Sequence, residues 1–287
     1  MRLLSFQIQN HQTFGAVVDD GIVDLGKRLR HFSDLKTLIE RNGEPQARDE
    51  ICGANADFAL SDVVFLPPIP SPGKILCVGV NYPDRNEEYR DGSERPRRPS
   101  IFVRFPFSLV GHEQDIVRPR ESDKLDYEGE IVIVVGRQGR RIPEADAEQH
   151  IAGFTLMNEG TLRDWTRHGK FNVTQGKNFD RSGSIGPWMV TSDVIRSYAD
   201  LHLQTRVNGE IRQNDTTANL LFPIRFLVSY ISTFTTLIPG DLIATGTPPG
   251  AGARFEPPRY LMPGDIVEIE SPEIGLLRNT IVAETQY

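Results

Sequence analysis

Apolar and polar positions alternate with a period of two along much of the chain, a pattern typical of β-strands. Near the start, two short apolar runs flank Asp19-Asp20-Gly21, which predicts a hairpin. Residues 34–41 have helical character, with Ser33 as the expected N-cap and Gly43 just past the expected end. The start of the chain therefore predicts a small unit that mixes strands and helix.

A proline-rich stretch separates this unit from the rest. Residues 66–74, LPPIPSPGK, contain four prolines in nine positions, which predicts a stiff extended connector that leads into the strand KILCVGV. We therefore expect a small N-terminal α/β accessory domain over residues 1–66 and a larger domain over residues 67–287.

The larger domain is expected to be rich in strands. Asn208-Gly209 predicts a second hairpin, and the Pro-Gly pairs at 239–240 and 263–264 predict tight turns that feed strands. Apolar residues at helical spacing over 222–234 predict a helix that faces the core, and Pro143 suits the first position of another. Together these patterns favour a β-rich α+β fold.

Composition narrows the class of protein. Hydrophobic residues make up 38% of the 287 residues, charged residues 25%, and the net charge is −7, which argues against a general nucleic-acid binder. Cys52 and Cys77 have no CxxC spacing, so a reducing cytoplasm is the expected location. The longest aliphatic run, Ile131 to Val135, is too short to span a bilayer, so we expect no membrane partner.

The stretch LDYEGEIVIVVGR, Leu125 to Arg137, places Glu128 and Glu130 at the start of an apolar strand. Side chains alternate faces along a strand, so these glutamates are expected on one face about 7 Å apart. A water-exposed strand end is one explanation. The other is a divalent cation, because oxygen-only ligands suit Mg²⁺, Mn²⁺ or Ca²⁺. Glu159, at the end of the apolar run FTLM, is the candidate third ligand.

The order of several phrases resembles the fumarylacetoacetate hydrolase family from about Pro72 to the C-terminus. The phrases are GKILCVGVNY, FVRFPFSLVG, LDYEGEIVIVVGR, RDW, GKNFD, GPW, VNGE and TGTP. The resemblance implies a mixed β-roll catalytic domain, usually a homodimer, that holds Mg²⁺ or Mn²⁺, with Ca²⁺ as a substitute. It also implies a small 2-oxo or 1,3-diketo acid as substrate. Such enzymes hydrolyse, decarboxylate, hydrate or tautomerise it through an enolate that the metal stabilises.

Two departures from the family pattern bear on the reaction. The third ligand is usually the Asp of an Asn-Asp pair, whereas this chain has Asn158-Glu159. We expect Glu159 to bind metal with a shifted or bidentate geometry; a salt bridge to a nearby arginine is the alternative. The phrase NYPDRNEE places Arg85 where the family usually has a catalytic His, with Glu88 at the usual Glu position. Arginine stays protonated at neutral pH and cannot act as a general base.

Three outcomes therefore remain open. Glu88 can accept the proton itself, which keeps hydrolysis of a C–C bond as the leading expectation. Alternatively, Arg85 holds a substrate carboxylate and the enzyme is a tautomerase or decarboxylase of 2-oxo acids such as oxaloacetate. The third outcome is a binding protein without catalysis.

The resemblance also assigns roles to residues around the metal. Lys177 in QGKNFD is expected to act near the developing oxyanion, and Asp164 to anchor Arg163 or start a helix. A solvent-exposed lysine, a surface charge at position 104, turn glycines and a packing tyrosine are the corresponding structural alternatives. The expected substrate-binding residues are Tyr82, Arg104, Arg163, Gly246 and Thr247.

Overall fold

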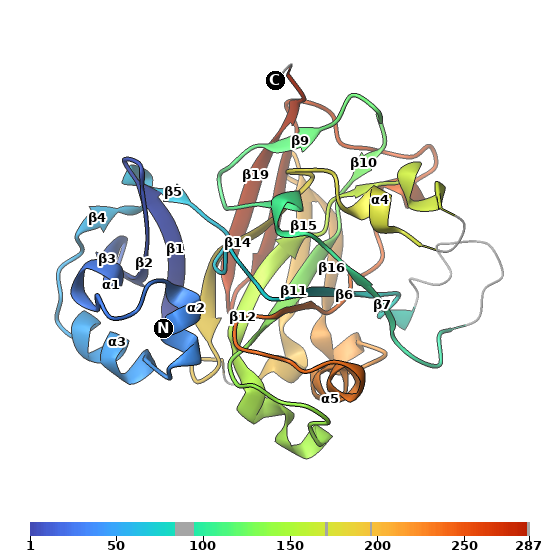
Figure 1. The fold of residues 1–287 in the computed structure, drawn as a ribbon. Helices are drawn as coiled ribbons and strands as arrows, with labels where there is room; N and C mark the ends of the chain where they lie inside the picture. Colours follow the sequence, from blue (N-terminus) through green and yellow to red (C-terminus); the bar gives the residue numbers. More distant parts are fainter. Residues whose placement is uncertain (84–94, 170–171, 196, 286–287) are drawn as a thin grey trace.

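The computed structural model describes residues 1–83, 95–169, 172–195 and 197–285 (Figure 1). The N-terminal unit is shown in blue. Its strands are β1 (Arg2–Ile8), β2 (His11–Val18), β3 (Gly21–Asp24), β4 (Phe58–Ala59) and β5 (Val64–Phe65). Its helices are α1 (Leu25–Arg28), α2 (Leu35–Glu40) and α3 (Glu44–Ile51), with the 3₁₀ turn η1 (Leu60–Asp62).

The rest of the chain is mainly strand. Its strands are β6 (Ile75–Gly79), β7 (Ser100–Val103), β8 (Leu109–Val110), β9 (Ile116–Arg118), β10 (Leu125–Asp126), β11 (Gly129–Val135), β12 (Ile151–Asn158), β13 (Thr161–Leu162), β14 (Gly183–Thr191), β15 (His202–Val207), β16 (Glu210–Thr216), β17 (Leu242–Ala244), β18 (Ile266–Ser271) and β19 (Gly275–Ala283). Its helices are α4 (Thr174–Lys177) and α5 (Ile224–Phe234), with the 3₁₀ turns η4 (Pro106–Ser108), η5 (Glu144–His150), η6 (Trp165–Arg167), η7 (Tyr198–Asp200), η8 (Thr217–Asn219) and η9 (Gly252–Arg254).

Local signals placed the first hairpin and helix α2 to within a residue, whereas α1 and α3 were not predicted. The hairpin between β2 and β3 turns at Asp19-Asp20, as predicted, with Val18 opposite Gly21. The N-cap of α2 is Asp34, whose carboxylate accepts a hydrogen bond from the Thr37 N–H, so the prediction of Ser33 was wrong by one position. Both residue types cap helices well, and composition alone does not rank two adjacent candidates.

The described strands form one large sheet, one smaller five-stranded sheet and a two-stranded pairing of β10 with β13. The large sheet has the order β4-β3-β2-β1-β14-β12-β11-β17-β6-β7, with β5 paired to β1 and β8 paired to β14. It is mixed, because β17 pairs with β6, and β14 with β8, in parallel, while its other pairs are antiparallel. The smaller sheet has the order β16-β15-β18-β19-β9. This arrangement confirms the predicted β-rich α+β class.

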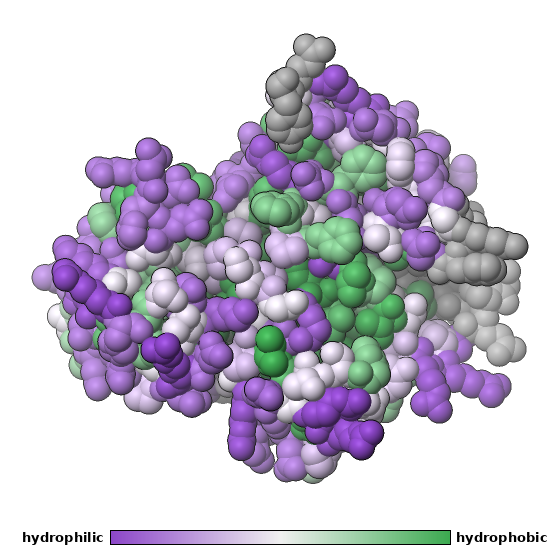
Figure 2. All heavy atoms as spheres, in the orientation of Figure 1, coloured by the Kyte–Doolittle hydropathy of each residue, from purple (hydrophilic) through white to green (hydrophobic). Residues whose placement is uncertain are grey.

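The N-terminal unit shares the large sheet with the rest of the chain. Strand β1 pairs antiparallel with β14, so that Leu3 lies opposite Met189. One buried cluster also contains residues of both parts, including Leu3, Leu38 and Val132. In the view of Figure 2, hydrophilic residues cover most of the N-terminal unit, at the left. The buried apolar residues of this unit are divided between that shared cluster and a second cluster within the unit, which contains Leu4, Phe6 and Ile22.

Strand β11 is buried on both faces because it lies between two cores. Ile131 and Ile133 pack toward the smaller sheet with Leu203 and Ile269. Val132 and Val134 belong to the other core. This explains an apolar run with no polar alternation. It also fixes the two faces of the glutamate motif, since even-numbered residues of the strand lie on the side of Val132.

Helix α5, drawn in orange in Figure 1, confirms the helical spacing seen in the sequence. Leu227, Val228 and Ile231 are buried within the main core. Pro223 precedes the first helical residue, where its missing N–H costs nothing. None of the helices among the described residues has the length and hydropathy needed to cross a lipid bilayer.

Candidate metal centre and acid-binding cavity

Three buried glutamates converge at one end of β11. Carboxylate oxygens of Glu128, Glu130 and Glu159 all lie within 4.8 Å of one another. The pairing of β11 with β12 sets Gly129 opposite Asn158, and the Glu159 N–H donates to the Glu128 carbonyl, which places these two glutamates side by side. Exposure of 4% or less excludes the explanation of a water-exposed strand end.

The backbone of Gly246 holds Glu130. Its N–H donates to Glu130 Oε2 at 2.8 Å. Gly246 has a φ of 107°, and a Cβ there would lie 2.7 Å from the Cβ of Asn81, so only glycine fits. Burial, together with the charges of the other two glutamates, raises the pKa of Glu130 well above its usual value. Gly246 was expected to bind substrate, but its N–H is already committed to a glutamate.

Lys177, at the end of α4, balances part of this negative charge. Its Nζ lies 2.6 Å from Glu128 Oε2 and 2.9 Å from Glu159 Oε2. Burial alone would lower the pKa of Lys177, but the two carboxylates outweigh it and the pKa is raised. The lysine is therefore buried and charged, and the alternative of a solvent-exposed lysine is wrong.

Arg163 is the second cation of the site and forms ion pairs with Asp126 and Glu128. Arg163 donates to Glu128 Oε1 and to Asp126 Oδ2, each at 2.7 Å. Asp126 is fully buried and also accepts hydrogen bonds from the N–H groups of Gly252 and Ala253. Sequence reasoning missed Asp126 and expected Asp164 either to anchor Arg163 or to start a helix. Asp164 stands at the N-cap position of η6 and accepts a hydrogen bond from the Ser122 hydroxyl. The signal available was an acid only two residues before the glutamate motif.

The glycine between the two glutamates faces the smaller sheet. A Cβ at Gly129 would come far closer to Thr205 Oγ1 than Cβ atoms ever do. Ile269 is also within ordinary contact of that position. The space at Gly129 is therefore filled by β15 and β18.

The glutamates open onto a cavity of about 770 Å³. Its lining includes Lys177, Arg163 and Thr247. No histidine is among the described residues that line it. The cavity therefore combines three carboxylates with cationic and hydroxyl side chains, a set that suits a small anionic ligand together with a cation.

Arg104 and Tyr82 lie away from the positions that their predicted roles require. The Arg104 guanidinium is buried and donates to Ser108, to the Gly160 carbonyl and to the Ser182 hydroxyl. It supports the backbone next to Glu159, so the surface-charge alternative is wrong and contact with substrate is not what its geometry favours. Tyr82 is 1% exposed and does not line the cavity. Arg85 and Glu88 lie outside the described residues.

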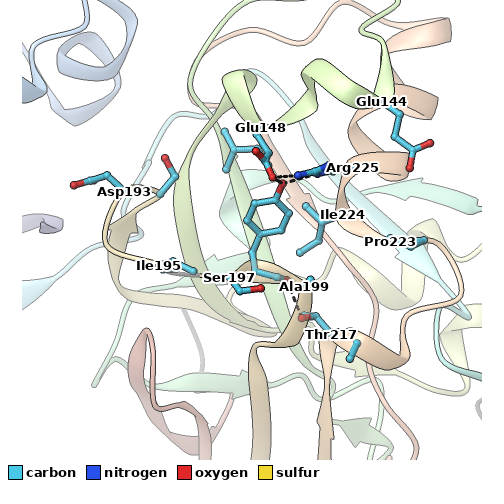
Figure 3. Close-up of a pocket in the computed structure, with 14 residues that line it drawn as sticks. Glu144, Glu148, Asp193, Ile195, Ser197, Ala199, Thr217, Pro223, Ile224 and Arg225 are labelled. Carbon is cyan, nitrogen blue, oxygen red and sulfur yellow. Dashed lines mark hydrogen bonds and ion pairs between the residues drawn. The ribbon is translucent and has the colours of Figure 1, made fainter.

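Figure 3 shows a separate cavity of about 720 Å³ beside α5. Glu148 there accepts hydrogen bonds from the Tyr198 hydroxyl and the Arg225 guanidinium. Its walls include Ile195 and Ile224. None of the predicted site residues that the structure describes lines this cavity.

The donor set at the glutamates fits a hard divalent cation. All three groups are carboxylates, which such ions prefer. Glu159 Oε1 is buried and has no hydrogen-bond partner among the described residues. An unsatisfied buried carboxylate oxygen is costly unless a ligand engages it. The salt bridges of Glu159 and Glu128 to Lys177 show that the cluster already attracts positive charge.

Comparisons with known proteins find one family model and several relatives that match most of the chain. Residues 74–282 match the family model described as fumarylacetoacetate (FAA) hydrolase C-terminal. The mitochondrial oxaloacetate tautomerase Fahd2a of Rattus norvegicus is 36% identical over 98% of this chain and 92% of its own length. The oxaloacetate tautomerase YisK of Bacillus subtilis is 36% identical over 98% of this chain and 100% of its own length.

Solved structures share the whole fold. A 5-carboxymethyl-2-hydroxymuconate delta-isomerase from Mycobacterium smegmatis superimposes with a TM-score of 0.78 and 31% identity, covering 100% of both chains. The maleylpyruvate hydrolase of Sphingobium sp. SYK-6, solved with manganese(II) and pyruvate, gives a TM-score of 0.82 and 26% identity, covering 99% of this chain and 100% of its own.

Proposed function

The chain is an enzyme of the fumarylacetoacetate hydrolase family, and from this premise we propose that it is a divalent-metal-dependent tautomerase of a small 2-oxo acid such as oxaloacetate. The observation that carries the proposal is the convergence of three buried carboxylates on a cavity that also contains Lys177 and Thr247. Such a cavity can bind the carboxylate of the acid and stabilise its enolate.

Tautomerisation is favoured over the hydrolysis that the sequence first suggested. Two relatives that align along nearly the whole chain are named oxaloacetate tautomerases. Hydrolysis requires a base that activates water, and the usual histidine is replaced by Arg85. The described cavity lining contains no histidine that could take its place. A proton shift between carbon and oxygen needs no attacking water, so this site suits it better.

Glu128, Glu130 and Glu159 are the residues that would hold the cation. When bound, a divalent cation withdraws electron density from the 2-oxo group and so stabilises the negative oxygen of the enolate. Mg²⁺ and Mn²⁺ both suit the three carboxylates. We propose one of these two ions, and the manganese in the maleylpyruvate hydrolase structure supports the class of ion.

The chain's own cations and hydroxyl position the acid. Because its pKa is raised, Lys177 carries a proton and can donate a hydrogen bond to the developing enolate oxygen. Arg163, which donates to Asp126 and Glu128, lines the same cavity and adds positive charge there. Arg85 remains the candidate for gripping a substrate carboxylate, and Glu88 the candidate proton acceptor.

The proposal is tested by three assays run in parallel on one preparation. The loss of the enol of oxaloacetate is followed by its ultraviolet absorbance, decarboxylation by CO₂ release, and hydrolysis by cleavage of acylpyruvates. Each is measured with Mg²⁺, with Mn²⁺ and with a chelator. We expect metal-dependent loss of the enol to be the fastest reaction. Acylpyruvate cleavage faster than tautomerisation would restore the hydrolase interpretation, and no metal-dependent turnover would favour a binding protein.

The variant Glu130→Gln tests the ligand assignment. Glutamine keeps an oxygen that can accept from the Gly246 N–H, but it removes one negative charge from the cluster. We expect both Mn²⁺ binding, measured by calorimetry, and turnover to be lost. Glu121→Gln, at an exposed position near the same strand, is the matched control. A Glu130→Gln enzyme with normal metal dependence would remove Glu130 from the ligand set.

Three finer expectations stay predictions. These are a homodimer, a cytoplasmic location, and a division into domains at residues 66 and 67. Sedimentation of the purified protein would measure the first, and limited proteolysis around the proline-rich connector would test the third.

A further inference from the structure

Gln213, on β16, connects the glutamate motif to the wall of the cavity. The side chain is 1% exposed. We propose that Gln213 is a positioning residue that turns the Thr247 hydroxyl into a hydrogen-bond donor for the carboxylate of the substrate. This inference rests on the proposed function of the cavity and names the residue that adapts it to an anionic ligand.

Three hydrogen bonds hold the Gln213 amide. Its Oε1 accepts from the Gly129 N–H at 2.9 Å. Its Nε2 donates to Thr247 Oγ1 at 2.8 Å and to the Pro248 carbonyl at 2.7 Å. The amide thereby ties the residue between the two motif glutamates to the loop that carries Thr247.

The orientation of this amide follows from its backbone partners. The Gly129 N–H can only donate, and the Pro248 carbonyl can only accept. Reversing the amide would set its NH₂ against the Gly129 N–H and its oxygen against the Pro248 carbonyl. Both contacts would be repulsive in a buried site, so the NH₂ faces Thr247.

The Gln213 NH₂ then decides which way the Thr247 hydroxyl points. Thr247 Oγ1 already accepts a hydrogen bond from Gln213, so its own hydrogen must be directed elsewhere. Thr247 lines the cavity, and none of the described residues accepts that hydrogen. A carboxylate is purely an acceptor, so a hydroxyl with its hydrogen aimed into the cavity is the complement it needs.

The hydrogen bonds of Gln213 also fix the distance between the Thr247 hydroxyl and the glutamate motif. Gly129 lies between Glu128 and Glu130, and Gln213 is the single side chain among the described residues that bonds both to its N–H and to Thr247. The Thr247 hydroxyl and the metal ligands are thus held at a fixed distance from each other. A 2-oxo acid presents its carboxylate next to its 2-oxo oxygen, so a fixed spacing selects this class of ligand.

The test is a double-mutant cycle between Gln213 and Thr247, read as binding of oxalate in the presence of Mn²⁺. Thr247→Val keeps the shape and removes the hydroxyl, and we expect affinity to fall about 10- to 100-fold, the loss expected for a hydrogen bond to a charged group. Thr247→Ser keeps a hydroxyl and should retain more of the oxalate affinity than Thr247→Val does. Gln213→Glu places an acceptor oxygen against Thr247, drawing its hydrogen away from the cavity, and we expect a loss of about tenfold.

The decisive quantity is the coupling between the substitutions at Gln213 and Thr247 in their effects on oxalate affinity. In the Thr247→Val background, Gln213→Glu should weaken oxalate binding by less than twofold, because the hydroxyl it reorients is gone. The same pattern is expected in turnover, with KM raised and kcat nearly unchanged. Losses that multiply, or a Gln213→Glu variant with unchanged oxalate affinity, would overturn the inference.

Two controls separate folding and function from this inference. The Mn²⁺ affinity without oxalate and the melting temperature of the Gln213 variants report whether Gln213 serves only the fold. If only these two quantities change and oxalate affinity does not, the positioning role of Gln213 is overturned. Gln213→Met introduces no charge and replaces Gln213→Glu in the test if Gln213→Glu does not fold. We expect Gln213→Met to lower oxalate affinity about two- to tenfold, and this loss should disappear in the Thr247→Val background. If the unaltered protein neither binds oxalate with Mn²⁺ nor tautomerises oxaloacetate, the proposed function fails independently of Gln213.

Discussion

Replacing Gly129 with alanine should misplace the metal ligands on either side of it. The added Cβ would overlap Thr205 Oγ1, with Gln213 and Ile269 at ordinary contact distances. Relief of that overlap requires a shift of roughly 1 Å, either in β11 or in β15. Overpacking of a core in this way costs about 1–3 kcal/mol. A change of that size lowers the melting temperature of a protein of this length by roughly 2 to 12 °C.

The structure also names the change that should rescue this variant. Thr205 Oγ1 is buried and has no hydrogen-bond partner among the described residues, so Thr205→Ala removes the overlapping atom without breaking a hydrogen bond. In the double variant Gly129→Ala/Thr205→Ala, most of the lost melting temperature should return. Thr205→Val keeps an atom at the same place and should not rescue, which makes it the matched control.

The assays are thermal unfolding followed by circular dichroism and Mn²⁺ binding followed by calorimetry. A displacement of 1 Å in a catalytic group can reduce activity about 100-fold, so Gly129→Ala should lose metal affinity and turnover together with stability. An alanine variant with unaltered melting temperature and metal affinity would refute the packing explanation. Equal rescue by Thr205→Ala and Thr205→Val would refute the identity of the overlapping atom.

Three further predictions concern charge. Lys177→Met should destabilise the metal-free protein by about 3–5 kcal/mol, because it removes the buried cation that contacts both Glu128 and Glu159, and thermal melts with saturating Mn²⁺ should recover much of the loss. Burial lowers the pKa of His112 below 6.5, and its Nδ1 accepts a hydrogen bond from the Arg278 backbone N–H. The contribution of neutral His112 to folding stability should therefore be fully present above pH 6.5 and decline below it. His112→Asn should flatten that decline in the free energy of unfolding measured with urea, and an unchanged pH profile would exclude His112 as its source. Arg85→His should raise acylpyruvate cleavage relative to tautomerisation; weaker substrate binding without added cleavage would instead assign Arg85 to the carboxylate.

The sequence was sufficient for the convergence of the glutamates because it depends on local rules. Alternation along a strand puts Glu128 and Glu130 on one face, and an acid at the end of the neighbouring strand supplies Glu159. The hairpin turn at Asn208-Gly209 and the helix α5 follow from equally local patterns. These features need only a few consecutive residues to be specified.

The parts that were missed depend on contacts between distant segments. Asp126 anchors Arg163 and a loop more than a hundred residues away, and nothing in its own neighbourhood distinguishes it from a surface acid. Arg104 was assigned from its position in a phrase, whereas its hydrogen bonds reach Gly160 and Ser182. The proposed role of Gln213 depends on its contacts with Gly129 and Thr247, and these residues are too far away in the sequence for the contacts to be predicted from it.

The pairing of β1 with β14 makes the N-terminal unit a cover for an exposed strand. A chain shortened to begin after the proline-rich connector would leave the backbone of β14 open along Met189 and Val190. An uncovered, apolar strand edge recruits other chains. We infer that such a fragment would self-associate or precipitate although every residue of the catalytic cavity is still present, and that the leading segment protects solubility as much as it shapes the enzyme.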